Sequence, residues 1–165
     1  MVKSVEDYDI GEEAFHLRDA MNDILANLEA LYLSHNVPLP TRRYWMVGDP
    51  AVDCEQAVVA FIQMYLGMPG DEAVTGQRCN GPLSMVVQLS ISRPTKVMNK
   101  NGSAPSGESI QQDSEWAALD AYVLMDGLAT LSPWALGPDV IATATVPEPQ
   151  GGFITTQVQL TVVLP

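Results

Sequence analysis

The pattern that most constrains the fold is a long alternation of side chains near the carboxyl end. Over residues 153–164, Ile, Val or Leu occupies every second position from 154 onward except 156, which is Thr, and the positions between are mainly Thr and Gln. A period of two places successive side chains on opposite faces, which is typical of a half-buried β-strand. Residues 83–93 repeat the pattern with Ser and Gln as the polar set, and we expect one face of this strand to be exposed to water. Two such strands require a sheet, because an isolated strand cannot bury its apolar face.

Two other segments show the helical period. Residues 12–35 and 108–131 carry apolar residues at spacings of three and four, and a proline follows each segment. Short strands are predicted at 41–48 and 140–146. The run 54–66 is compatible with a helix or a strand, and its Val and Phe content favours a strand.

The element order is therefore helix, two or three strands, helix and two strands. This order predicts a single α+β domain over residues 1–165, in which two helices pack on an antiparallel or mixed sheet. A chain of 165 residues fits one domain and can fold without a metal or a disulfide. Residues 93–107 are rich in Gly, Pro, Ser and Asn, so we expect a long exposed loop there.

The charge is strongly acidic and unevenly distributed. The net charge is −12, and Lys and Arg are too few for general nucleic-acid binding, which depends on cations that displace counterions from phosphate. Residues 1–55 hold 11 acids and 4 bases, and residues 108–165 hold 7 acids and no base, so each segment carries −7. Residues 56–107 hold 2 acids and 4 bases and carry +2. We expect no membrane association, because the sequence has no signal peptide or spanning run.

The residues that could support chemistry form no recognisable catalytic motif. There is no phosphate-binding glycine loop, nucleophile elbow or zinc-protease motif, and we expect neither an enzyme nor a cofactor. Cys54 and Cys79 are predicted to be buried thiols, with a disulfide as the alternative, and no local signature supports a Cys–His dyad. Asp49, Asp53 and Glu55 could attract Mg²⁺ or Ca²⁺, but a solvated turn is the favoured interpretation, so no metal site is predicted.

The polar strand faces and the basic segment are candidate contact surfaces. The last strand is free of charged residues from residue 150 onward, whereas free edges and faces are usually protected by Lys or Glu. A subunit interface would explain this, and an ordinary Thr- and Gln-rich solvent face is the alternative. The candidate contact residues for a second subunit or a partner are Arg93, Lys96, Lys100, Gln157, Gln159 and Thr161.

Several short motifs, taken in order, carry a resemblance to a known family. They are DCEQ at 53–56, GMPG at 67–70, CNGPL at 79–83, YVLMDGL at 122–128 and GGF at 151–153. The strand that follows CNGPL ends in Arg-Pro, and a Thr- and Val-rich strand follows GGF. Over about residues 42–165 the chain resembles the tail-terminator (tail-completion) proteins of long-tailed actinobacteriophages.

The resemblance implies a structural virion protein assembled in the host cytoplasm. Such proteins are α+β subunits of a six-fold ring that ends tail-tube polymerisation and joins the tail to the neck. The implied partners are further copies of the chain, the tail tube protein, a neck or head-completion protein, and genomic DNA that passes without specific binding. An acidic lumen would repel that DNA, while Arg93, Lys96 and Lys100 would contact an acidic neighbour.

Two other classes of function remain open at the level of sequence. A head-closure (stopper) protein or another neck or tail connector would use a similar small subunit. A small cytosolic enzyme or binding module is the third class.

Overall fold

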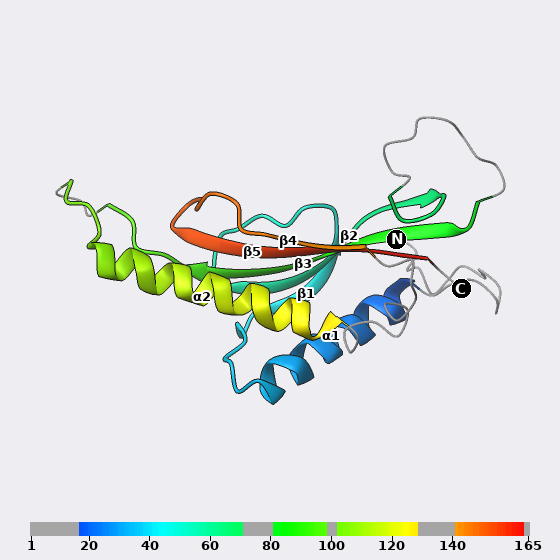
Figure 1. Cartoon of the computed structure of the whole chain (residues 1–165), viewed down its shortest axis with the longest axis horizontal. Helices are drawn as coiled ribbons and strands as arrows, with labels where there is room; N and C mark the ends of the chain where they lie inside the picture. Colours follow the sequence, from blue (N-terminus) through cyan, green and yellow to red (C-terminus); the bar gives the residue numbers. More distant parts are fainter. Residues whose placement is uncertain (1–16, 71–80, 99–101, 129–140, 164–165) are drawn as a thin grey trace, which may run out of the picture.

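The computed structural model describes residues 17–70, 81–98, 102–128 and 141–163. Its elements are α1 (Leu17–Ser34), β1 (Arg43–Val47), β2 (Gln56–Leu66), β3 (Leu83–Pro94), α2 (Gly107–Asp126), β4 (Ile141–Thr145) and β5 (Phe153–Val163). Both helices lie on one face of a five-stranded sheet (Figure 1). The predicted α+β class, with two helices on a mixed sheet, is confirmed, and the ambiguous run 54–66 contains a strand.

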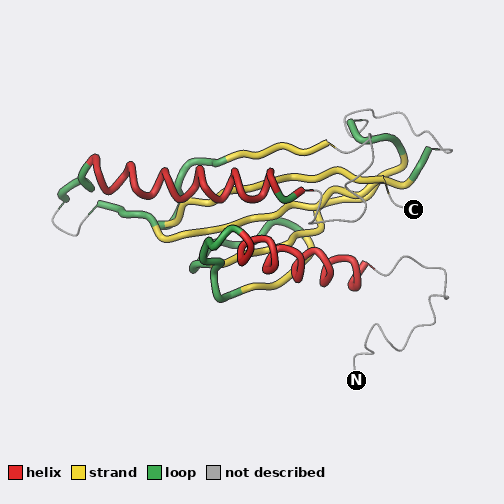
Figure 2. The backbone as a smooth tube through the Cα atoms, turned by 60° about the horizontal axis from the view of Figure 1, so that its bottom comes forward, coloured by secondary structure: helices red, strands yellow, loops and turns green. Residues whose placement is uncertain are grey.

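The strand order places β3 at the centre of the sheet. The order is β1-β2-β3-β5-β4; β1 is parallel to β2, and the other pairs are antiparallel. α2 connects β3 back across the helix-covered face toward β4 and β5, as the second view shows (Figure 2). β5 is therefore an interior strand, and β1 and β4 form the two edges of the sheet.

The core lies between the helices and the sheet. The apolar stripe of α1, the buried face of α2 and alternate residues of the three inner strands meet there. Members of this core include Met21, Ile24, Leu28, Val59, Leu89, Leu124, Val158 and Leu160. Each such side chain contributes about 1.5–3 kcal/mol when it is removed from water, so this layer accounts for much of the stability of the fold.

The expectation that one face of the 83–93 strand is exposed to water is wrong. Its polar residues Ser84, Gln88, Ser90 and Ser92 are at most 8% exposed. Strands flank β3 on both sides, and the polar groups bond within the sheet: Ser92 bonds Thr155 across to β5 at 3.0 Å, and Gln88 donates to Ser90 at 3.2 Å. The alternation indicated the two faces correctly, but it could not reveal that both are covered.

The connection between β1 and β2 explains part of this cover. Because these strands are parallel, residues 48–55 must return along the sheet, and they do so on the face opposite the helices (Figure 1). The amide of Gln56 anchors the segment by donating to the carbonyl of Ala51 at 2.7 Å. Behind it, Val58 and Ala60 of β2 are fully buried. A coil segment thus does the covering that a helix performs in longer parallel crossovers.

The bounds of α2 and of the loop before it differ from the bounds that the sequence predicted. Arg93 and Pro94 belong to β3, so the exposed connection is shorter than 93–107. Ser106 caps α2 by accepting a hydrogen bond from the amide of Ser109 at 3.2 Å. The helix ends at Asp126 with Gly127 as its cap, whereas the sequence predicted an end at 131; residues 129–131 lie outside the described part.

Candidate functional site

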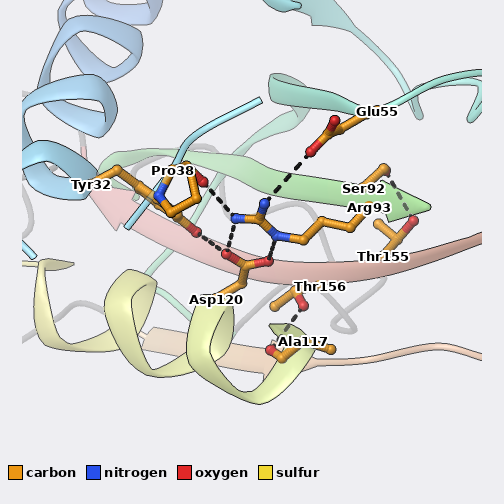
Figure 3. A network of polar contacts seen from close by, with 9 residues as sticks. All are labelled: Tyr32, Pro38, Glu55, Ser92, Arg93, Ala117, Asp120, Thr155 and Thr156. Carbon is orange, nitrogen blue, oxygen red and sulfur yellow. Dashed lines mark hydrogen bonds and ion pairs between the residues drawn. The ribbon is translucent and has the colours of Figure 1, made fainter. Parts of the chain in front are cut away.

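The densest polar arrangement of the described chain is built around Arg93, near the end of β3. Its Nε and Nη2 donate to the two carboxylate oxygens of Asp120 on α2, at 2.7 and 2.8 Å (Figure 3). Nη2 also donates to the carbonyl of Pro38 at 2.8 Å, and Nη1 lies 3.6 Å from the carboxylate of Glu55. The Asp120 side chain is 1% exposed and that of Arg93 10%, so this is a buried, bidentate ion pair.

Two aromatic residues complete this cluster, which we call the Arg93 cluster. The hydroxyl of Tyr32 on α1 donates to Asp120 at 3.0 Å, and the guanidinium carbon of Arg93 lies 4.8 Å from the centre of the Trp116 ring. Burial raises the pKa of Tyr32 far above its ordinary value, and the negative charge of Asp120 adds to the effect. Burial alone would lower the pKa of Arg93, but the hydrogen bonds and charge of Asp120 leave it raised.

The Arg93 cluster joins segments that are distant in the sequence. It connects α1, the turn after α1, the end of the 48–55 crossover, β3 and α2. All its groups are paired with one another. This arrangement stabilises the relative positions of the elements, and Arg93 is turned toward the interior of the chain instead of serving as an exposed contact.

Hydrogen bonds hold the first two residues after β3, Thr95 and Lys96, and the residues that follow them are exposed. The amide of Thr95 donates to the carbonyl of Gly152, and Asp113 accepts bonds from the Thr95 hydroxyl and the Lys96 amide, each at 2.8 Å. Val97 and Met98 are 59% and 66% exposed. A surface hollow of about 380 Å³ lies beside Thr95, with Lys96 and Glu55 in its wall. Lys96 is thus a surface cation on an anchored segment, whereas Lys100 lies outside the described residues.

The predicted residues of the last strand lie on the sheet face opposite the helices. Gln157 is half-buried, Gln159 is exposed and Thr161 is 6% exposed. Their strand pairs with β3 and β4 on either side, so these residues can offer a partner a sheet face but not a strand edge. Gln159 offers the largest exposed polar surface of the three, and their predicted role as partner contacts remains a prediction.

The acidic turn before β2 pairs with arginine. Arg42 Nη1 donates to Asp53 and to the sulfur of Cys54, both at 2.8 Å. A hydrogen bond to Cys54 and the charge of Arg42 lower the pKa of Asp53. Glu55 faces Arg93, as described above. Within the described ranges, His, Cys, Asp and Glu side chains form no cluster that could hold a metal ion.

The burial of Cys54 differs from the prediction. Cys54 is partly exposed and accepts a hydrogen bond, so the expectation of a buried apolar thiol is wrong for this residue. Cys79 lies outside the described residues. Cys54 is a free thiol, so the alternative of a disulfide between the two is wrong in this structure.

Comparison with models of protein families and with curated protein sequences finds no match for this chain. Neither described helix combines the length and the apolar character needed to cross a membrane.

Sequence reasoning missed Asp120 and Tyr32. Asp120 falls between Trp116 and Val123 on the apolar stripe of α2, and an acid at such a position signals a buried partner. The signal was present in the helical period, but the identity of the partner depends on the position of β3, which the period does not give.

Proposed function

We propose that the chain is a tail-terminator subunit of a long-tailed bacteriophage, which caps the tail tube and forms the surface that joins the neck. The observation that carries this proposal is the position of the family-like motifs in the fold. Residues 53–56 lead into β2, 67–70 end it, 122–128 close α2, and 151–153 turn β4 into β5. These four motifs thus occupy turns and ends of the elements of this α+β subunit, which supports the resemblance.

The distribution of acids supports a wall that DNA can pass without binding. α2 exposes Glu108, Glu115 and Asp126, and the helix contains no Lys or Arg. A surface of one sign repels phosphate at short range. We therefore assign the exposed side of α2 to the lumen of the proposed ring.

The anchored segment after β3 supports a contact with an acidic neighbour. Lys96 is fixed at its backbone by Asp113, and Val97 and Met98 extend from it into solvent. The cation supplies charge, and the two apolar side chains supply contact area, for an acidic neighbour. The tube protein or the neck protein is the partner that the proposal assigns to it.

Deletion of the gene from the phage that encodes the chain tests the role. A terminator stops tube growth, so electron microscopy of the lysate should show tails of irregular, excessive length. A plasmid copy of the gene should restore the normal length. Tails of normal length beside heads that have lost their DNA would contradict the proposal and favour the head-closure alternative.

A charge reversal tests the basic segment separately. The Lys96→Glu/Lys100→Glu variant should fail to join heads to tails in an assembly assay, while the matched Lys96→Arg/Lys100→Arg variant should join them normally. Unchanged tail length and joining in the Glu variant would overturn the assignment of this surface.

A further inference from the structure

The β4 edge of the sheet lacks the charged residues that protect the edge strands of most monomers. In the described part of the chain, no strand pairs with the outer side of β1 or of β4. β4 has the sequence IATAT without a charged residue, and four of its five residues are exposed, Ile141 at 46%. Soluble monomers usually protect an edge strand with Lys, Pro or a bulge, because its unpaired amide and carbonyl groups can pair with another chain.

In β1, the amide and carbonyl groups of every second residue point away from the sheet. The Gly48 amide bonds the Phe61 carbonyl, and the Ala57 amide bonds the Arg42 carbonyl. Even-numbered residues of β1 therefore bond β2, and Arg43, Trp45 and Val47 direct their amide and carbonyl groups away from the sheet.

β4, at the opposite edge, also directs the amide and carbonyl groups of every second residue outward, as a comparison with β1 shows. Arg43 and Trp45 face the helices, because they pair with the core-facing residues of β2. β4 runs in the opposite direction to β1 and lies at the other end of the sheet. Its helix-facing residues, Ala142 and Ala144, therefore also direct their amide and carbonyl groups outward.

We propose that the outer edge of β4 pairs antiparallel with the outer edge of β1 in a second copy of this chain. Each strand has five residues, and their opposite directions make the junction antiparallel while the helices of both copies stay on one side. Ala142 then lies opposite Trp45 and Ala144 opposite Arg43, so small residues meet large ones. Ile141 lies opposite Met46. This inference rests on the proposed ring, whose interface it specifies.

The junction is of the head-to-tail kind. It uses two different surfaces of each copy, so it can be repeated until a ring closes. Self-pairing of β4 about a two-fold axis would also be antiparallel, but it would stop at a dimer and leave both β1 edges unpaired. The experiment therefore has to separate these two arrangements.

A charge placed on the β4 edge tests the contact. The Ala144→Lys variant places a cation on the strand that should pair with the second copy. Native mass spectrometry of this variant should show a monomer, and its far-UV circular dichroism spectrum should match that of the unaltered chain. The matched variant Ala118→Lys makes the same change at an exposed position on α2 and should keep the ring. Rings that persist in Ala144→Lys would overturn the proposal.

A disulfide tests the register in assembled tails. In the Met46→Cys/Ile141→Cys variant, oxidation should link copies into a ladder of covalent oligomers, with a 46–141 bridge identified by peptide mapping. A bridge needs Cβ atoms about 3.5–4.5 Å apart, so only the proposed register forms it efficiently. Self-pairing about the centre of β4 places residue 143 opposite its own copy, so dimers linked through residue 143 in the Thr143→Cys single variant would overturn the proposal. Rings without the 46–141 bridge also overturn it and leave the terminator role intact, whereas normal tails in the deletion strain overturn that role.

Discussion

At the scale of single residues, the buried Arg93–Asp120 pair restricts the substitutions that are compatible with a stable fold. A carboxylate that is 1% exposed is stable only while the cation stays beside it. We expect Arg93→Met to lower the free energy of unfolding by about 3–5 kcal/mol, because it leaves Asp120 buried without a counterion. Urea unfolding followed by circular dichroism measures the loss.

The paired variant provides the control. Arg93→Met/Asp120→Leu removes both charges, so it should recover most of the stability lost in Arg93→Met. Losses that add independently would contradict this account of the pair.

The raised pKa of Tyr32 predicts a loss of stability in alkali. Above about pH 10 the unfolded state loses the tyrosine proton while the folded state keeps it. The free energy of unfolding should then fall by about 1.4 kcal/mol per pH unit from this residue, while below pH 10 its contribution is complete. Tyr32→Phe should show a shallower decline between pH 10 and 11 than the unaltered chain. Parallel curves for the two proteins would refute the prediction.

The sequence singled out Arg93 but neither its burial nor the cluster members Asp120 and Tyr32. Arg93 lies beside Pro94 in the sequence, at the start of a polar segment, and this position predicts an exposed basic surface. Its partner lies 27 residues further along the chain and meets it only because α2 packs over β3 and β5. Local patterns cannot predict such a contact.

At the scale of elements, the contact between the ends of α1 and α2 depends on a missing side chain. A Cβ on Gly127 would overlap the Cδ1 and Cδ2 atoms of Leu31 and lie 2.8 Å from its Cγ. We expect Gly127→Ala to destabilise the fold by about 1–3 kcal/mol through overpacking. A thermal melt measures this. In the Leu31→Ala background the same substitution should cost much less, and an equal cost in both backgrounds would argue against the clash.

The cap of α2 provides a second prediction. Ser106→Ala removes the acceptor for the Ser109 amide, and should lower the free energy of unfolding by about 1 kcal/mol. Ser106→Asp keeps an acceptor at the cap and should retain the stability. Equal melting temperatures for Ser106→Ala and the unaltered chain would show that the cap contributes nothing.

The strands were predictable as elements, but their surroundings were not. The alternation in residues 153–164 gave the correct division of β5 into two faces, since Val158 and Leu160 enter the core while Gln157 and Gln159 lie opposite. The same alternation in β3 failed to predict burial on both faces. That burial depends on the crossover 48–55 and on the central position of β3, which are properties of topology.

At the scale of the whole molecule, the exposed side of α2 is the surface that the proposed function assigns to the lumen of the ring. Glu108→Lys/Glu115→Lys places cations on the exposed side of α2, and phage carrying it should release DNA more slowly because phosphate is attracted to the wall. Timed DNA ejection measures the rate, and added salt should reduce the difference. The matched variant Asp49→Lys/Asp53→Lys alters exposed acids of the 48–55 crossover, on the opposite face of the sheet (Figure 1), and should release DNA at the normal rate. Slowing by the crossover variant alone would contradict the assignment of α2.

The Arg93 cluster also has a consequence for the kinetics of unfolding. Its contacts join segments from residue 32 to residue 120, so they cannot form until α1, β3 and α2 have assembled. Interactions that form after the transition state slow unfolding and hardly change the folding rate. We therefore expect the cluster to form after the transition state, so its loss should shorten the lifetime of the folded subunit far more than it delays folding. In the proposed virion role, a long lifetime helps the particle to persist outside its host.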